Sequence, residues 1–311
     1  MKKLILATAI LVATTFGAMA DSYRFGYETL ITSRNGIAYY AQDEGLFKAA
    51  GVSVEVLTNS VGGRKNLALL SAGKIDFATA DFSALIEHNN TFGNDLVAVY
   101  VYSDATEMSL LSKVSPSIID YNGRAIATGK TSVARMVFPH VFPSVKFQPV
   151  YMGLNLRVPA MLSGQTDALL GFAGTQLFNI AYSQDIKDIH VIRYADYEPR
   201  YIGPSIIVRK TFLENNYEDV AKVVGVFDDV LKQSIANREL TIDAVIARNP
   251  RLTKDIELDR LNYVYDNFVV TANVEHHGLN SIDPSRIEFY ASRLVPDSTL
   301  APSDYYAKID Y

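Results

Sequence analysis

The sequence predicts an α/β protein of two related lobes, each built on a mainly parallel β-sheet. Apolar runs of strand length alternate along the chain with longer segments of helical period, and this alternation is typical of βαβ units. A Gly-x-x-Asp motif occurs at residues 73–76 and again at 164–167, each time after an apolar helix end and before an apolar run. Two copies of one structural device indicate two lobes of related design.

The periodicity predicts four strands and three helices in the first lobe. The strands are expected at residues 23–28, 52–57, 75–80 and 95–102. The helices are expected at residues 36–51, with a break at a glycine, at 62–73 and at 81–90. Asp81 stands where the third helix begins, a position that aspartate favours as an N-cap.

The second lobe repeats the scheme. Its strands are expected at residues 108–113, 123–129, 145–152 and 166–172, and its helices at 130–142 and 155–164. Residues 191–197 are expected to lead out of this lobe, and residues 204–210 to form a further strand. The clearest helix of the chain follows at 217–237, where apolar residues recur at intervals of three and four. A later helix within 281–294 has a good start at Asp283-Pro284.

The repeated motif is interpreted as a corner between a helix and a strand. Gly73 and Gly164 supply the left-handed conformation that ends a helix. Asp76 and Asp167 then fall near the start of a strand, whereas open α/β sheets bind ligands beyond the carboxyl ends of their strands. We therefore expect both aspartates to be structural.

The composition excludes several classes of protein. The 311 residues include 29 basic and 34 acidic residues, a net charge of −5, and no basic patch of the kind that nucleic acid needs. The chain has no cysteine, so it must be stabilised by its own core. The G-x-S-x-G motif, which would indicate hydrolase chemistry, does not occur in the sequence. The pair His276-His277, a candidate metal-binding feature, falls in a predicted loop. We expect neither an enzyme nor a cofactor or metal site.

Residues 1–20 have the pattern of a cleavable signal peptide. Lys2 and Lys3 precede an apolar stretch from Leu4 to Phe16, and Ala18-Met19-Ala20 fits a cleavage site. No later segment has eighteen unbroken apolar residues, so no membrane span is expected. The mature chain is expected to begin near Asp21 and to reside in the periplasm.

Several motifs resemble the family of periplasmic solute-binding proteins for sulfonates, taurine, nitrate and thiamine-pyrimidine precursors. The first lobe contains "YYAQDEGLFKAAGVSVEVL" and "ALLSAGKIDFATAD", similar to the family's E-G-x-F-x-x-x-G-x-x-V-x-x pattern and its L-x-x-G-x-x-D-F corner. The second lobe contains "YNGRAIATGKTS" and "VPAMLSGQTDALLGF", followed by "PSIIVRKTFLENNYEDV". Near the end, "HHGLNSIDPSRIEFYASRL" resembles the closing segment of the branch that binds pyrimidine and flavin precursors.

The resemblance implies a type II periplasmic-binding fold, in which two lobes joined by two crossover segments close on a ligand by a hinge motion. The crossovers would lie near residues 102–107 and 197–204. Lobe I would comprise residues 21–103 and, with the C-terminal helices, 205–311; lobe II would comprise 104–204. The function implied is that of a monomer that delivers a small-molecule ligand to the permease of an ABC importer.

The ligand is expected where strands end and helices begin, because free helix amides there attract accepting oxygens. Some of the candidate positions allow a second interpretation. Asp81 also fits a helix cap, Phe82 and Phe172 also fit the core, and Arg64 also fits a solvated surface charge. The candidate ligand-binding residues are Tyr27, Glu28, Asn35, Arg64, Asp81, Phe82, Ser83, Glu107, Thr131, Ser132, Phe172 and Tyr201.

The carboxylates and aromatic rings among these candidates favour a neutral or cationic heterocycle, or another small aromatic solute. An anionic solute such as a sulfonate, taurine or nitrate is the alternative, which Arg64 or Lys130 would favour. In the anion-binding branch, small or hydroxyl residues usually stand at the Asp81 position. Two other roles stay open: a ligand-sensing component for a receptor, and an enzyme similar to a pyrimidine synthase, which the lack of cysteine opposes.

Overall fold

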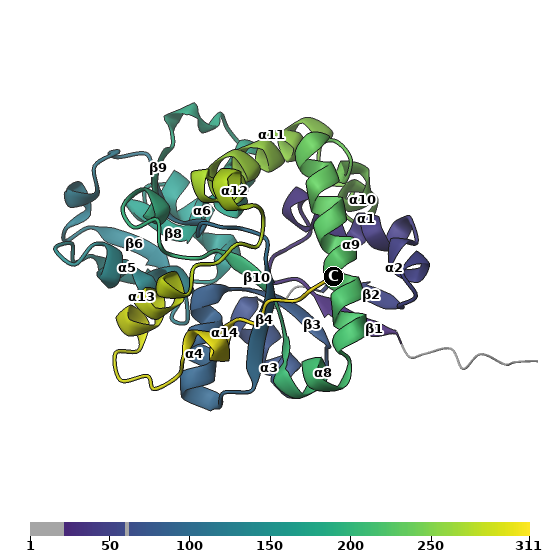
Figure 1. The fold of residues 1–311 in the computed structure, drawn as a ribbon. Helices are drawn as coiled ribbons and strands as arrows, with labels where there is room; N and C mark the ends of the chain where they lie inside the picture. The colour runs from purple at the N-terminus through teal and green to yellow at the C-terminus, as the bar shows by residue number, and fades with distance from the viewer. Residues whose placement is uncertain (1–21, 60–61) are drawn as a thin grey trace, which may run out of the picture.

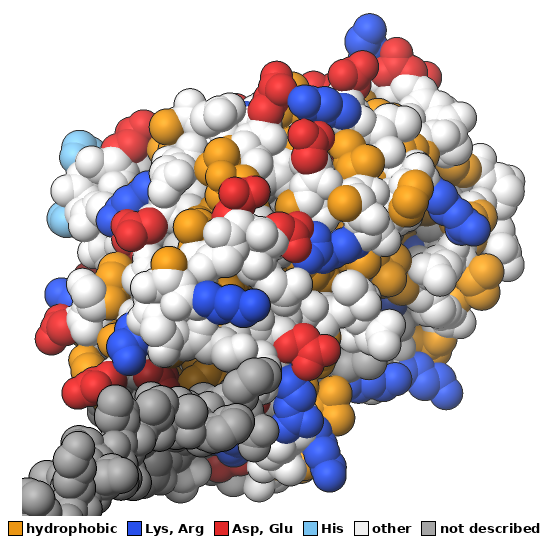
Figure 2. Space-filling view, turned by 90° about the vertical axis from the view of Figure 1, so that its right-hand side faces the viewer, with side chains coloured by type: hydrophobic (Ala, Val, Ile, Leu, Met, Phe, Trp, Pro, Cys, Tyr) orange, Lys and Arg blue, Asp and Glu red, His pale blue; other side chains and the backbone are white. Residues whose placement is uncertain are grey.

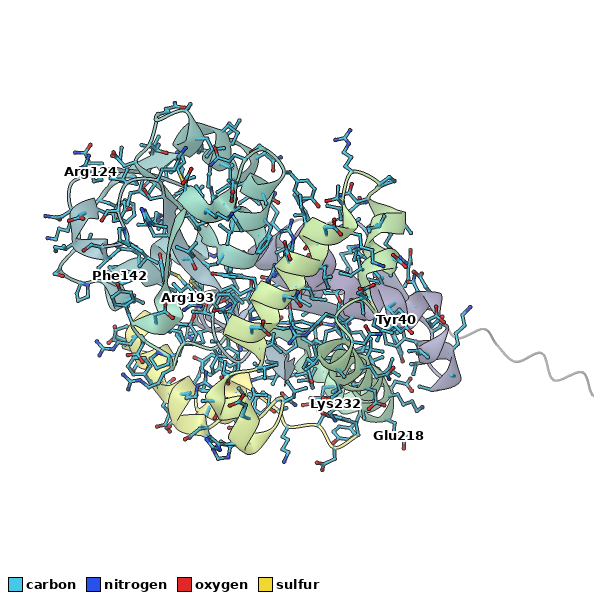
Figure 3. The ribbon with its side chains drawn as sticks, turned by 90° about the horizontal axis from the view of Figure 1, so that it is seen from above. Tyr40, Arg124, Phe142, Arg193, Glu218 and Lys232 are labelled. Carbon is cyan, nitrogen blue, oxygen red and sulfur yellow. The ribbon has the colours of Figure 1, made fainter. Side chains whose placement is uncertain are left out.

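The protein folds into two α/β lobes that lie side by side (Figure 1). The computed structural model describes residues 22–59 and 62–311, so the predicted signal peptide falls outside the described residues. Each lobe contains one five-stranded sheet with helices packed on it, which confirms the predicted fold class. Seen from above, Arg124 and Phe142 lie at the lobe II end of the molecule, and Tyr40 and Glu218 lie toward the other end (Figure 3).

Lobe I is built on a sheet with the strand order β2-β1-β3-β10-β4. Its strands are β1 (Tyr23–Gly26), β2 (Val54–Leu57), β3 (Phe77–Asp81), β4 (Leu96–Val101) and β10 (Pro204–Arg209). The helices between them are η1 (Ser33–Asn35), α1 (Gly36–Asp43), α2 (Leu46–Ala49), α3 (Gly63–Ser71) and α4 (Phe82–Phe92). The predicted helix 36–51 is interrupted at Gly45, whose φ of 68° is left-handed.

Lobe II is built on a sheet with the order β7-β6-β8-β5-β9. Its strands are β5 (Met108–Ser112), β6 (Ala125–Thr128), β7 (Gln148–Tyr151), β8 (Ala168–Phe172) and β9 (His190–Arg193). Its helices are η2 (Ile118–Tyr121), α5 (Val133–Val141), α6 (Leu154–Leu162), α7 (Ala173–Ala181), η3 (Ile186–Asp188) and η4 (Tyr194–Asp196).

The two sheets have the same topology. In lobe I, β10 lies antiparallel between β3 and β4, and the other strands share one direction. In lobe II, β5 lies antiparallel between β8 and β9 in the same way. Each reversed strand is the first one the chain forms after crossing from the other lobe, so it enters its sheet from the opposite side. The sheets are thus mainly parallel, as predicted, with one reversed strand each.

The repeated Gly-x-x-Asp motif forms the same corner in both lobes. Gly73 and Gly164 have φ values of 67° and 78°, a region that favours glycine. The Asp76 carboxylate accepts a hydrogen bond of 2.9 Å from a backbone N–H of β1, and the Asp167 carboxylate accepts one of 3.0 Å from a backbone N–H of β6. Both aspartates therefore tie the corner to the neighbouring strand, and their predicted structural role is confirmed.

The two crossover segments run against each other between the lobes. The Gly203 N–H donates to the Ser103 carbonyl at 3.1 Å, and the Thr106 N–H donates to the Tyr201 carbonyl at 3.1 Å. A Cβ atom at Gly203 would lie 2.4 Å from the carbonyl oxygen of Ala105. The close approach of the two segments therefore requires a glycine at this position.

Two elements of lobe II differ from the sequence-based expectation. Residues 190–193 form β9, which pairs with β5 at the sheet edge, whereas this stretch is expected only to lead out of the lobe. The periodicity analysis predicts no helix at residues 173–181, yet α7 begins there directly after β8.

The C-terminal part of the chain packs on both lobes. Its helices are α8 (Lys210–Asn215), α9 (Tyr217–Ala236), α10 (Ile242–Arg248), α11 (Lys254–Val264), the π-helix η5 (Tyr265–Val269), α12 (Ala272–His277), α13 (Pro284–Leu294) and α14 (Pro302–Tyr305). The predicted amphipathic helix is confirmed as α9, which packs on α1. Helix α11 packs on α7 of lobe II, and α13 contacts both α4 and α5. These helices therefore brace the lobes against each other.

The surface charge and the character of the helices are as follows. On the face shown in Figure 2, lysine and arginine side chains are interspersed with acidic ones. Of the helices within 22–59 and 62–311, none has the length and apolar character that crossing a membrane requires.

Candidate functional site

A cleft of about 510 Å³ lies between the lobes, at the carboxyl ends of the parallel strands. Its lining residues belong to the segments that follow these strands in both sheets. Lobe I contributes Glu28, Thr29, Leu30, Gly62, Gly63, Arg64, Lys65, Asp81 and Ala84. Lobe II contributes Thr131, Ser132, Val133, Leu154, Asn155, Arg157, Gly171, Phe172, Thr175 and Gln176.

Five helices begin at this cleft. They are α3 and α4 of lobe I and α5, α6 and α7 of lobe II, each of which supplies lining residues from its first turn. The first turn of a helix has free N–H groups and the positive end of the helix dipole. The backbone around the cleft therefore favours negative charge or hydrogen-bond-accepting oxygens.

Glu28 lies buried on the lobe I wall of the cleft. One of its carboxyl oxygens, Oε2, accepts a hydrogen bond of 3.0 Å from the Asp81 N–H, and Oε1 has no hydrogen-bond partner among the described residues. Burial raises the pKa of Glu28 to about 8; the Arg34 charge opposes this rise, and the Asp81 and Glu107 charges add to it. Glu28 is consequently mostly protonated near neutral pH.

Asp81 is the N-cap of α4. Its carboxylate accepts hydrogen bonds from the Ser83 N–H at 3.0 Å and from the Thr106 hydroxyl at 3.2 Å. Burial raises the pKa of Asp81 to about 6, and the hydrogen bonds from Ser83 and Thr106 limit the rise. The capping role that the sequence left open is thus present, and the carboxylate also accepts a hydrogen bond from the crossover segment.

Arg64, at the start of α3, reaches from lobe I to lobe II. Its guanidinium donates a hydrogen bond of 2.8 Å to the carbonyl oxygen of Thr131 and forms an ion pair with Glu87. Arg64 is therefore not a free surface charge. It links the two walls of the cleft at one end.

The lobe II wall combines hydroxyls, an aromatic ring and a guanidinium. Ser132 precedes α5, and its hydroxyl makes no capping hydrogen bond. Phe172 ends β8 and faces the cleft from a partly buried position. Arg157, in the first half of α6, is buried, and burial lowers its pKa. Six of the predicted site residues thus line the cleft: Glu28, Arg64, Asp81, Thr131, Ser132 and Phe172.

Four other predicted residues are engaged in the core or in local structure. The Tyr27 hydroxyl accepts from the Ala38 N–H at 3.1 Å, inside lobe I. Asn35 accepts from the Thr32 N–H at 3.1 Å and so holds its own turn. Phe82 and Ser83 belong to the first turn of α4, Phe82 in the core and Ser83 against the cap. None of these side chains lines the cleft.

Glu107 and Tyr201 also lie away from the cleft, at the junction of the lobes. Glu107 is paired with Arg34, whose Nη2 lies 2.6 Å from Oε1. The ring of Tyr201 packs edge-on against Tyr290, with 4.4 Å between ring centroids. Each precedes the first strand that the chain forms after a crossover, and tertiary partners cover both side chains.

Several lining residues are not among the candidates from sequence. Thr29 and Leu30 follow Glu28 directly, and Thr175 and Gln176 follow Phe172 in the helix that the periodicity did not predict. The order of elements gave a usable signal for these four, since they follow strand ends. Arg157 carries no such signal, because it lies inside a helix.

Metal binding is not indicated by the side-chain arrangement. In the part of the chain that the structure describes, no three histidine, cysteine or acidic side chains come together in a way that could hold an ion.

A comparison with protein families identifies the chain. A model of the NMT1/THI5-like family matches residues 34–239, more than half of the sequence. The chain belongs to the NMT1/THI5-like family. This membership confirms the family resemblance that the motifs indicated. In a comparison with curated protein sequences, no relative matches.

Solved structures share the fold of this family member. The periplasmic aliphatic sulphonate binding protein SsuA from Escherichia coli aligns with a TM-score of 0.67 at 17% identity, over 93% of this chain and 92% of that one. The alkanesulfonate-binding protein SsuA from Xanthomonas axonopodis pv. citri, bound to MOPS, aligns with a TM-score of 0.67 at 17% identity, over 92% of this chain and 98% of that one. A Candida albicans protein described as having the generic periplasmic binding protein fold aligns with a TM-score of 0.64 at 12% identity, over 93% of this chain and 97% of that one. At these identities the likeness concerns the fold.

Proposed function

We propose that this protein is an extracytoplasmic substrate-binding protein that captures a small organic solute and delivers it to an ABC importer. The observation that carries the proposal is the cleft of about 510 Å³ between two lobes, lined by both of them and by the starts of five helices. A pocket of this size accommodates a small organic molecule. The solved structures of similar fold that are described as sulfonate-binding proteins support the same role.

Binding would be coupled to closure of the lobes. A solute held by both walls adds contacts that exist only when the lobes are close together, so it shifts the population toward the closed form. The contact from Arg64 to the Thr131 carbonyl links the walls in the same sense. The closed form would then be the one that the permease in the inner membrane recognises.

The body of the solute is proposed to be aromatic or heterocyclic. Phe172 and the partly exposed Leu30 and Leu154 give the cleft an apolar side against which a ring packs. A heterocycle similar to a thiamine-pyrimidine precursor has such a ring, and an organic anion such as a sulfonate is the second candidate. The helix starts around the cleft favour the second candidate.

The proposal extends to location and partners. The pattern of residues 1–20 supports export to the periplasm by a cleavable signal peptide, and the binding role calls for an ABC permease as partner, with the protein acting as a monomer. A sensory role, in which the closed form is presented to a receptor, uses the same cleft. Gene deletion in the native host would distinguish the transport role from the sensory role. Deletion of the adjacent permease genes abolishes uptake of the solute, whereas deletion of adjacent receptor genes does not.

Closure on a solute is the direct test of the proposed function. The mature protein is titrated, in a buffer free of sulfonates, with alkanesulfonates, taurine, nitrate, aminopyrimidines and aromatic acids while Tm and the radius of gyration are recorded. A solute at a hundred times its Kd should stabilise the protein by about 2.7 kcal/mol and reduce the radius of gyration. If no solute changes either quantity, the proposed function is wrong.

A further inference from the structure

The described part of the chain buries three arginines, and only one of them lines the cleft. Arg34, Arg157 and Arg260 are each at least nine-tenths buried. Arg34 and Arg260 lie at the junction of the lobes, whereas Arg157 faces the cleft from α6. A buried charge is costly unless it is paired, so the partners of the three guanidinium groups are informative.

Two of these arginines bind a carboxylate through the same edge of the guanidinium. Nε and Nη2 of Arg34 donate to Glu107 at 3.0 and 2.6 Å. Nε and Nη2 of Arg260 donate to Glu257 at 3.2 and 3.0 Å, while Nη1 donates to the carbonyl oxygen of Gly174 at 2.8 Å. This edge presents two parallel N–H groups, the arrangement that suits an oxyanion.

Arg157 repeats the arrangement of Arg260 without the carboxylate. Its Nη1 donates to the carbonyl oxygen of Leu170 at 3.1 Å, which fixes the plane of the guanidinium. Its Nε has no hydrogen-bond partner among the described residues. Burial alone accounts for the lowered pKa of Arg157, with no contribution from a carboxylate nearby.

The surroundings of Arg157 hold its guanidinium at the wall of the cleft, with Nε buried. A Cβ atom at residue 129 would lie 2.6 Å from Nη2 of Arg157, so Gly129 makes room for the guanidinium. Helices α5, α6 and α7 begin around it, and their first turns line the same wall. Their positive ends add to the charge of Arg157. This wall of the cleft is therefore a built site for negative charge.

We propose that the guanidinium of Arg157 is the anion subsite of the cleft, and that the solute is an organic molecule carrying a carboxylate or sulfonate group. The inference rests on the proposed function, since it names the ligand class of the same cleft. The oxyanion would bind Arg157, and the apolar or aromatic body would lie toward Phe172 and Leu30. This assignment favours the anionic candidate over a cationic heterocycle.

The carboxyl groups on the opposite wall are compatible with an anionic ligand. Asp81 directs its oxygens to Ser83 and Thr106 as the cap of α4. Glu28 keeps its proton near neutral pH because it is buried. The repulsion expected from a carboxylate at position 81 is thereby reduced.

The test compares ligands that differ only in charge on three forms of the mature protein. Benzoate and benzenesulfonate are matched with benzamide and benzenesulfonamide, and ethanesulfonate and inorganic sulfate are included as probes without a ring. Binding is measured by calorimetry and by Tm on the wild type, on Arg157→Gln and on Arg124→Gln. Arg124 is a matched control because it is an exposed arginine of lobe II, paired with Asp167 and outside the cleft.

The proposal expects at least one oxyanion to bind the wild type and its neutral partner to bind far more weakly. Arg157→Gln should lower the affinity for the oxyanion by roughly 10- to 150-fold, which is the contribution of a hydrogen bond to a charged group. Arg124→Gln should leave this affinity unchanged. If benzamide or benzenesulfonamide binds as tightly as its oxyanion partner, and Arg157→Gln binds these ligands as the wild type does, the inference is wrong and the proposed function stands. If no solute of this panel or of the panel that tests the proposed function binds the wild type, the proposed function itself is wrong.

The ligand-free protein gives an independent readout. Replacement of an uncompensated buried charge by a neutral amide removes a cost, so Arg157→Gln should keep or raise Tm. Arg260→Gln, which leaves the buried Glu257 carboxylate unpaired, should lower it. If Arg157→Gln lowers Tm as much as Arg260→Gln does, Arg157 is a structural residue and the subsite is refuted.

Discussion

The ion pair between Arg34 and Glu107 is expected to be a main stabilising contact between the lobes. Arg34 precedes α1 of lobe I and Glu107 precedes β5 of lobe II, and their side chains are 4% and 1% exposed. Arg34 also donates to the Thr175 hydroxyl at 3.2 Å. In Glu107→Gln, the Arg34 charge would remain buried without its carboxylate. Removal of one partner of a buried pair costs about 3–5 kcal/mol.

This magnitude is large enough to separate the pair from surface contacts. A loss of about 3–5 kcal/mol corresponds to a fall in Tm of about 5–8 °C, at about 1.6 °C per kcal/mol for roughly 290 residues with an unfolding entropy of about 2.1 cal/mol/K each. The matched control is Glu239→Gln, because Glu239 pairs with Lys254 at 3.0 Å and both side chains are about half exposed. An exposed pair contributes less than about 1 kcal/mol.

The assay is urea unfolding of the ligand-free mature protein, followed by circular dichroism. A double variant, Arg34→Met with Glu107→Leu, replaces both charges by apolar side chains and should recover most of the stability that Glu107→Gln loses. If Glu107→Gln lowers the free energy of unfolding no more than Glu239→Gln does, the Arg34–Glu107 pair does not compensate buried charge and the reasoning is wrong. If the double variant is no more stable than the single one, the loss comes from packing and not from the unpaired guanidinium.

Two further predictions follow from the same structure. Because burial raises the pKa of Glu28 from 4.5 to about 8, the folded protein binds more protons than the unfolded chain between these values, and its free energy of unfolding should fall as pH rises through that window. Glu28→Gln should flatten this dependence in urea titrations across the range, and an unchanged pH profile would contradict the assigned pKa. In Gly203→Ala, the new methyl group would meet backbone oxygens of Ala105 and Ser103 at 2.4 and 2.6 Å, so unfolding experiments should show a loss of about 1–3 kcal/mol. Gly153→Ala is the control, since no atom lies within 4 Å of its Cβ position, and equal losses in the two variants would refute the steric argument.

The local pattern of the sequence was sufficient for most of the fold. The amphipathic period predicted α9, and the glycines predicted where α1 and α3 end. The Gly-x-x-Asp corners were recognised because a left-handed glycine and a strand-capping aspartate act within a few residues of each other. The sequence did not predict the start of α7 directly after β8, because a helix that begins without a turn or a capping side chain leaves no local signal.

The sequence by itself determined the class of fold, the two related lobes and the segments that border the cleft, because hydrophobic period, capping and glycine conformation are local properties. Only the tertiary structure decided which side chains in those segments face the cleft. Glu107 is 73 residues from Arg34 in sequence and is taken up by that partner, whereas Arg157 faces the cleft from inside a helix. Pairing of buried charges depends on which segments the packing brings together, and no local pattern records it.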